Sequence, residues 1–552
     1  MKQLVTSLID EIVSDQYVFL GSWCCKEFSD NLIDYKFDNR LLLSEKFKEF
    51  ELLYEFFIIE LSKKLNNIHK IEKPVIFWRI LIGPWLSYFI FQVIEKYELI
   101  NLLNSTEIFA NTVTYNKALI NNDLESFFQN YNNPNYESLI AGEIIDYLNI
   151  KNVKTSKATE VLTKKNNKSL LRDTLNTIIH FFFFWYDPQI LIKDTYLNLK
   201  NELLLFLKLY KIPKLDVHSK SCPDFKFSIK FRNNNLGVYS DELTNLLSNL
   251  ILKHIPKSFL EGYSDLESLY SKNWSNKPEV IFTSNAIWQN TIFAHYCATK
   301  KREGTKIIIG QHGGSFGLSN YLFDETHHYR VSDININWGW RDDAKSKPVG
   351  YFLKKSIDYR PTEKLLFILI NNSRNSISSE LFFNYDIYLK KQNSFLKMLD
   401  THISSDVSIR IKQNDSSILD KINSLFENYR FSDLTTDFYS DLKTAKLVVA
   451  TYNSTVFLQC IFLNIPVLMY IHLTDYSVRK SEQKLFDELI ENHIVFFDNA
   501  KLACHINSIW GNVNSWWNNE KLQIVLSRFR SKMVKENISL LDNISDLIKN
   551  LN

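Results

Sequence analysis

The chain has 552 residues, of which 45% are hydrophobic, 23% charged and 14% aromatic. This composition excludes a predominantly disordered protein and predicts two or three folded domains. Lysine and arginine number 65 against 62 acidic residues, and the resulting net charge of +3 argues against nucleic acid as the main partner.

The six cysteines are scattered, with no C-x-x-C pair and no histidines at zinc-binding spacing. They indicate reduced thiols of a cytoplasmic protein, with neither a disulfide framework nor a metal site. Residues 1–13 have the pattern of an amphipathic helix that contains acidic side chains. The sequence therefore predicts no signal peptide.

The N-terminal part is expected to begin with a strand at Tyr17–Trp23 and to be largely helical from about 44 to 210. Pro74–Ile94 is long and apolar enough to span a membrane, but Arg79 and the Gly83-Pro84 step interrupt it. We therefore expect a buried pair of helices with a bend. A peripheral position at the inner membrane stays open.

From about residue 189 the chain alternates between predicted strands and helices. Gln189–Asp194, Glu279–Thr283 and Lys306–Gly310 are apolar runs that predict strands, and residues 284–301 predict a helix. Strands that are apolar throughout are typical of a parallel sheet covered on both faces.

A second alternating block begins near Pro361. Its clearest unit consists of a strand at Leu447–Thr451, a helix at Thr455–Leu463 and a strand at Pro466–Ile471. Such a unit is right-handed and places the helix N-terminus at the carboxyl edge of the sheet, where open sheets bind their ligands.

These blocks predict an α/β fold of the GT-B type, with two Rossmann-like domains facing each other. We expect the acceptor-side domain at residues 1–355, with its helical insertion at about 44–210. The nucleotide-sugar-binding domain and its C-terminal helices are expected at residues 356–552.

The first candidate site follows the predicted strand Lys306–Gly310. Gln311, His312, Gly313 and Gly314 come next in a chain that has only 13 glycines. Glycines let a backbone or a ligand approach closely, and a histidine there can act as a general base or contact a phosphate. A tight turn with a hydrogen-bonded histidine is the structural alternative.

The second candidate site is the start of the predicted helix after Leu447–Thr451. Asn453, Ser454 and Thr455 combine side-chain hydrogen-bonding groups with the free N–H groups of a helix N-terminus, which suits a phosphate or pyrophosphate. Ser454 could equally be an ordinary helix cap. Both interpretations stay open at this point.

Arg410 and Lys412 lie on one face of a predicted strand and suit a phosphate or a sugar carboxylate, although a salt-bridged edge is an equal alternative. In residues 323–340, Glu325 is a reserve general base, and a solvated, charged loop is the simpler interpretation for most of its neighbours. The usual phosphate-loop, dinucleotide, zinc-protease and serine-hydrolase motifs do not occur.

The blocks VFLGSWC, FWRILIGPWL, IIIGQHGGSFG, VSDININWGW and TYNSTVFLQCIFLNIPVL are spread over most of the chain. Together they resemble a family of transferases from bacterial gene clusters for O-antigen and other surface glycans. Genes for sialic-acid-like nonulosonic sugars often lie near the genes of that family.

A more distant resemblance is to GT-B enzymes with CMP- or CDP-activated donors, namely bacterial sialyltransferases, Kdo transferases and teichoic-acid glycerophosphotransferases. It implies that Ser454 and Thr455 hold the donor phosphate, and that His312 with Gly313 is a catalytic or phosphate-contacting turn. The chain departs from the sialyltransferase pattern near Lys412-Gln413, where the expected His-Pro is absent.

The resulting hypothesis is a metal-independent glycosyltransferase that acts in surface-polysaccharide synthesis. It would move a sugar, with a nonulosonic acid from a CMP donor as the favoured case, to a glycan or lipid-linked acceptor. A nucleotide-sugar substrate is implied, and no separate cofactor. The alternatives are a polyol-phosphate transferase that uses a CDP-alditol, and a non-catalytic nucleotide-binding scaffold. We expect a cytoplasmic protein.

Overall fold

The structure is a computed structural model. It describes residues 2–6, 17–25, 28–33, 40–102, 108–113, 119–150, 153–156, 189–209, 222–270, 274, 277–341, 343–352, 356–370, 385–411, 419–433, 435–471 and 477–551.

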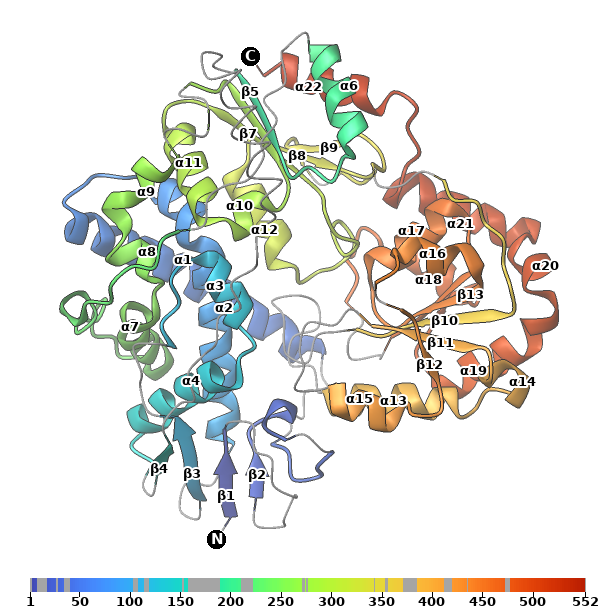
Figure 1. The fold of residues 1–552 in the computed structure, drawn as a ribbon, viewed down its shortest axis with the longest axis horizontal. Helices are drawn as coiled ribbons and strands as arrows, with labels where there is room; N and C mark the ends of the chain where they lie inside the picture. Colours follow the sequence, from blue (N-terminus) through green and yellow to red (C-terminus); the bar gives the residue numbers. More distant parts are fainter. Residues whose placement is uncertain are drawn as a thin grey trace.

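Three parallel sheets form the framework of the described chain, and Figure 1 shows them at separate places in the molecule. The first sheet has the strand order β2-β1-β3-β4. Its strands are β1 (Lys2–Val5), β2 (Tyr17–Phe19), β3 (Ile108–Val113) and β4 (Val153–Ser156). Only β2 coincides with a predicted strand, so the N-terminal part is less purely helical than expected.

The middle sheet has the strands in chain order, β5-β6-β7-β8-β9. They are β5 (Ile190–Lys193), β6 (Val280–Thr283), β7 (Lys306–Gly310), β8 (Ile334–Asn337) and β9 (Ser346–Pro348). The predicted strands of this block are confirmed. β5 and β6 are buried along their whole length, as expected for parallel strands covered on both faces.

The third sheet has the order β12-β11-β10-β13-β14-β15, with every neighbouring pair parallel. Its strands are β10 (Lys364–Ile368), β11 (Val407–Arg410), β12 (Arg430–Phe431), β13 (Ala445–Ala450), β14 (Val467–Tyr470) and β15 (Val495–Phe496). The chain runs outward from β10 to β12 and then returns to the other side of β10 at β13. This is the Rossmann strand order, which reverses between β10 and β13.

The helices that precede β10 are α1 (Arg40–His69), α2 (Val75–Asn101), α3 (Leu124–Asn130), α4 (Pro134–Tyr147), α6 (Leu199–Leu209), α7 (Glu242–His254), α8 (Lys257–Leu260), α9 (Tyr263–Tyr270), α10 (Ala286–Gln289), α11 (Thr291–Arg302) and α12 (Phe323–Val331). Short 3-10 turns lie at Ser22–Cys24 and Ile229–Phe231.

The helices after β10 are α13 (Tyr385–Leu396), α14 (Thr401–Ser404), α15 (Leu419–Leu425), α16 (Phe438–Thr444), α17 (Thr455–Leu463), α18 (Gln483–Glu491), α19 (Asn499–Ile509), α20 (Val513–Trp517), α21 (Glu520–Met533) and α22 (Leu540–Lys549), with a 3-10 turn at Trp510–Asn512.

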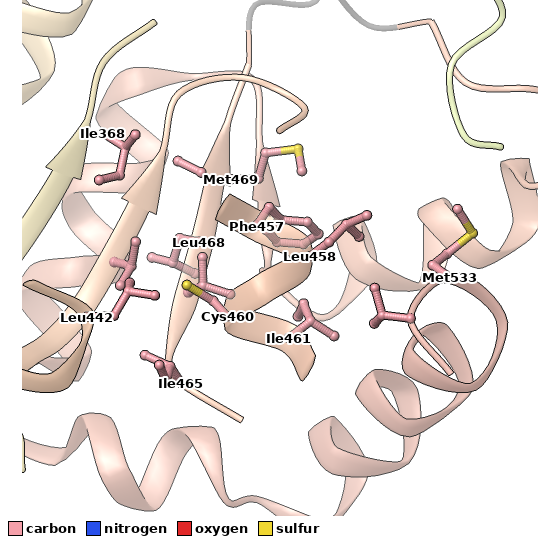
Figure 2. Packing of buried hydrophobic residues seen from close by; sticks show 14 of the residues in the cluster. Ile368, Leu442, Phe457, Leu458, Cys460, Ile461, Ile465, Leu468, Met469 and Met533 are labelled. Atoms are coloured by element: carbon pink, nitrogen blue, oxygen red, sulfur yellow. The ribbon is translucent and has the colours of Figure 1, made fainter. Parts of the chain in front are cut away.

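α17 has the predicted bounds and is almost entirely apolar. It ends at Asn464, whose left-handed backbone (φ 56°) terminates the helix. Figure 2 shows Phe457, Leu458 and Ile461 of α17 packed in the space between β14 and α21. The packing fixes the position of the helix relative to the sheet, and therefore the position of its N-terminus.

α2 is one continuous helix through Pro84, so the expected helix pair is wrong. The hydroxyl of Ser87 donates to the carbonyl of Pro84 at 2.9 Å. The expected burial is confirmed, and Arg79 is accommodated because Glu55 accepts two hydrogen bonds from it at 2.6 and 2.7 Å. Among the described residues, α2 alone is long and apolar enough to cross a membrane, and most of that stretch is buried in the protein.

The middle and third sheets share one hydrophobic core. Tyr351, after β9, packs against Phe462 of α17 with ring centroids 4.2 Å apart. The C-terminal helix α22 packs on α6, beside the middle sheet (Figure 1). The predicted α/β fold with parallel Rossmann-like sheets is confirmed, and the chain crosses between its two halves more than once.

Candidate functional site

The turn after β7 is held by the side chain of Gln311. Its amide nitrogen donates to the carbonyl of Gly313 at 2.7 Å, and its amide oxygen accepts from Trp338 N–H at 3.0 Å and from Trp340 Nε1 at 3.1 Å. Gln311 is 2% exposed. Its amide therefore serves to shape the turn that carries His312.

The turn after β13 brings Asn453 and Ser454 to the start of α17. Ser454 is 5% exposed and its side chain makes no capping hydrogen bond. Among the described residues, neither Ser454 Oγ nor Asn453 Oδ1 has a hydrogen-bonding partner. A buried hydroxyl without a partner is costly in a folded protein, so that of Ser454 is available to a water molecule or a ligand.

The two turns touch each other directly. A Cβ atom placed on Gly314 would lie 2.6 Å from the carbonyl oxygen of Ser454, and closer still to the backbone of Thr455. The hydroxyl of Ser315 donates to the carbonyl of Asn453 at 3.0 Å. The structure thus brings together candidate residues that lie about 140 positions apart in the sequence.

This contact lies at the carboxyl edge of the third sheet, next to the reversal in strand order. The N–H of Thr451 donates to Ile368 at the end of β10 at 3.3 Å, which places the end of β13 beside β10. Rossmann-type sheets bind their ligands at this position, outside the carboxyl ends of the two strands that flank the reversal.

His312 is half-buried among other rings. Its ring centroid lies 5.0 Å from Phe316, 5.4 Å from His328 and 6.2 Å from Tyr196. Burial lowers the pKa of His312 to about 4. The imidazole is therefore neutral at neutral pH and can accept a proton or donate one hydrogen bond.

Glu325, in the first turn of α12, is part of an ion pair. Its Oε2 accepts from the N–H of Gly317 at 2.9 Å and lies 2.8 Å from the guanidinium of Arg479. Gly317 has a φ of 72° and forms the end of the glycine turn. The carboxylate thus ties this turn to residues 477–482 of the other half.

Arg410, at the end of β11, is paired with Asp441 of α16, which also binds Lys364. Its guanidinium donates to the carbonyl of Thr436 at 3.2 Å as well. These contacts match the salt-bridged alternative considered for this strand. Lys412 lies outside the described residues.

The expected solvated loop at residues 323–331 is wrong, because these residues form α12, with His327 and His328 buried. Trp288 covers both histidines, at 4.9 Å from His327 and 6.0 Å from His328. Apolar residues on both sides of the charged ones allow a helix with one buried face.

Sequence reasoning also missed the end of β5. Asp194 and Tyr196 adopt left-handed backbone conformations, with φ of 48° and 62°, which are uncommon outside glycine and often mark functional sites. Tyr196 stacks near His312 and its hydroxyl accepts from Asn285 at the end of β6. Aspartate gives a weak sequence signal for this conformation, and tyrosine gives none.

In the described part of the chain, no group of three or more histidine, cysteine, aspartate or glutamate side chains could hold a metal ion. The groups that gather at the two turns are backbone N–H groups, a serine hydroxyl, an asparagine amide and an imidazole. Such a set suits an anionic ligand.

A family model described as LIC12162 family transferase matches residues 2–548. A search of curated proteins finds no match. Among solved structures, MurG of Acinetobacter baumannii is 11% identical over 53% of this chain and 80% of its own, with a TM-score of 0.30.

The glycosyltransferase WaaG, involved in lipopolysaccharide biosynthesis, is 13% identical over 52% of this chain and 82% of its own, with a TM-score of 0.28. The spinosyn rhamnosyltransferase SpnG, complexed with spinosyn aglycone, is 12% identical over 53% and 78%, with a TM-score of 0.28.

Proposed function

We propose that this chain, which belongs to the LIC12162 family of transferases, moves a sugar from a nucleotide donor to a glycan or lipid-linked acceptor. The family supplies the reaction class, which is group transfer. The contact of Gly314 with the start of α17 carries the proposal, because it brings a histidine turn to a free helix N-terminus at the edge where Rossmann-type sheets bind nucleotides.

The donor phosphate is assigned to the first turn of α17. Its leading N–H groups have no partner within the helix, and the helix dipole gives this end a partial positive charge. The hydroxyl of Ser454 adds a buried donor that lacks a partner among the described residues. A phosphate would satisfy all of these groups at once.

Transfer requires a leaving phosphate. The acceptor oxygen forms a bond to the anomeric carbon, the bond from that carbon to the phosphate oxygen breaks, and the phosphate departs with the electron pair. Fixed N–H donors aimed at that phosphate stabilise the charge as it develops, and they do so without a metal ion. Neutral His312, on the opposite turn, would contact the phosphate or the acceptor.

The finer assignment follows the resemblance to surface-glycan transferases. We propose a CMP-type donor, a nonulosonic acid as the transferred sugar and a surface polysaccharide as the product. The site would work in the cytoplasm, with peripheral attachment to the inner membrane, and without a cofactor beyond the nucleotide sugar. Consumption of a CDP-alditol instead of a CMP-sugar would replace this assignment with polyol-phosphate transfer.

A thermal-shift panel tests the donor site. CMP, CDP, UDP, TDP and GDP are each added to the purified chain, since a ligand that binds only the folded state raises its melting temperature. We expect at least one nucleotide to stabilise the wild type and to lose this effect in Ser454→Ala. The matched control is Ser531→Ala, which alters an exposed hydroxyl on α21.

No stabilisation of the wild type by any nucleotide in the panel contradicts the proposed function. Binding with no transfer, together with normal glycan synthesis in cells that carry Ser454→Ala, favours the scaffold alternative.

A further inference from the structure

Helix α12 presents a second acidic residue on a different face from Glu325. Asp324 and His328 are four positions apart, so they lie on the same side of the helix. Asp324 is half-buried, and among the described residues none forms an ion pair or hydrogen bond with its carboxylate. This contrasts with Glu325, whose carboxylate pairs with Arg479.

The surroundings of Asp324 are aromatic. Tyr88 of α2 lies close enough for the charge of Asp324 to raise its pKa, in addition to the larger effect of burial. The ring of Tyr88 lies 6.2 Å from Trp288, 5.2 Å from Phe128 and 4.9 Å from Tyr131. Trp288 is 5% exposed, whereas Tyr88 is half-buried, so Tyr88 is the ring that can meet the apolar face of a sugar.

The side of α12 that carries Asp324 and His328 faces the predicted donor site. The ring of His328 lies 5.4 Å from that of His312, which follows β7. Side chains four positions apart on a helix are about 5–6 Å apart. Asp324, His328 and His312 therefore form a row. The row begins beside Tyr88 and ends at the turn after β7, which contacts the start of α17.

We propose that Asp324 is the catalytic base of the transfer and that the acceptor sugar lies against Tyr88. This inference rests on the proposed function. The proton of the acceptor hydroxyl moves to a carboxylate oxygen of Asp324 as the acceptor oxygen forms its bond to the anomeric carbon. The electron pair of the broken bond leaves with the nucleotide phosphate, so atoms and charges balance.

Basicity supports this choice over His312. Burial raises the pKa of Asp324 to about 7 and lowers that of His312 to about 4. A base is most effective when its pKa lies near the working pH, because it is then both deprotonated and able to hold a proton. His312 remains available to donate a hydrogen bond to the phosphate.

The charge of Asp324 acts on Tyr88 of α2, and His327 and His328 lie one turn along α12. Burial keeps the pKa of both histidines well below the ordinary value, so both are neutral at neutral pH. The activity is therefore expected to rise with pH through about 7, in step with deprotonation of Asp324.

The activity test compares Asp324→Asn with Asp265→Asn, which alters an exposed aspartate in the first turn of α9. The probes are UDP-glucose, TDP-glucose, GDP-mannose and CMP-N-acetylneuraminic acid, with octyl glycosides as acceptors. We expect Asp324→Asn to lose transfer about 100-fold or more and to retain its nucleotide-induced thermal shift. Asp324→Glu should restore part of the rate.

A second measurement needs no turnover. Because the folded state favours protonated Asp324, its contribution to stability is present below pH 4 and is lost as the pH rises through 7. Asp324→Asn should therefore melt above the wild type at pH 8 and together with it at pH 4. Equal melting at both values overturns the inference.

The outcomes separate the two proposals. A wild type that binds no nucleotide refutes the proposed function, and this inference fails with it. A wild type that binds and transfers, with full transfer by Asp324→Asn, refutes only the role of Asp324. The role of Asp324 is also refuted if the transfer rate of Asp324→Asn depends on pH in the same way as that of the wild type.

Discussion

Replacing Gly314 by alanine should push the turn after β7 away from the start of α17. The added Cβ would lie 2.6 Å from the carbonyl oxygen of Ser454, whereas ordinary contact begins at 3.4 Å. The neighbouring atoms are backbone, so no side-chain rotation relieves the overlap. The two turns must separate by at least about 0.8 Å, which is close to the displacement that costs about 100-fold in rate.

The same substitution should lower the stability of the protein by about 1–3 kcal/mol, the usual range for overpacking. Gly313→Ala is the matched control, because its Cβ would meet only the ring of Phe316, at 3.7 and 3.8 Å. The assay is the nucleotide-induced thermal shift, followed by transfer of sugar to an octyl glycoside. Equal nucleotide binding and transfer in the two alanine variants would show that the contact between the turns has no functional role.

Ser454→Ala should leave stability unchanged or raise it by about 1 kcal/mol, since it removes a buried hydroxyl without a partner in the described structure, and urea unfolding measures this. Arg479→Ala should destabilise the protein by about 3 kcal/mol, because it leaves the charge of Glu325 buried without its cation; a loss below 1 kcal/mol would contradict this. Lys421→Met should lower the stability by a similar amount, because Lys421 contacts the carboxylate of Asp386 at 3.0 Å and its loss leaves that charge buried. Adding Asp386→Asn to the same chain should restore part of the lost stability.

The sequence was sufficient where local pattern and global fold agree. The helix at Thr455–Leu463 is a continuous apolar run between a turn and Asn464, and the structure gives it the predicted bounds. The strand before Gln311 and the return to the sheet at Ile190–Lys193 were found for the same reason. Each is a short apolar segment bounded by turn residues.

The sequence pattern was insufficient where tertiary contacts determine the secondary structure or the burial of a segment. β1, β3 and β4 are short strands inside a region with strong helical periodicity, and their pairing partners are distant in sequence. Pro84 does not divide α2, because packing on both sides holds the helix together. The charged residues in the sequence of α12 suggested that it is exposed to solvent, although two of its histidines are buried under Trp288.

For the candidate site, the sequence predicted that two turns would matter, but it could not show that they touch. Nor could it separate the bonded groups from the free ones. Gln311 and Arg410 have hydrogen-bonding side chains that the structure uses internally, while Ser454 and Asp324 have no such partner among the described residues. The partners of Gln311 and Arg410 lie up to 31 positions away in the sequence, so no local motif records the distinction.

The most direct test of the central claim is the thermal shift of the wild type and Ser454→Ala with the nucleotide panel. A phosphate held at the start of α17 predicts a rise in melting temperature with at least one nucleotide, and loss of that rise in the variant, whose stability without nucleotide is not reduced. An equal nucleotide-induced rise in both proteins would contradict the assignment of the phosphate to this helix N-terminus.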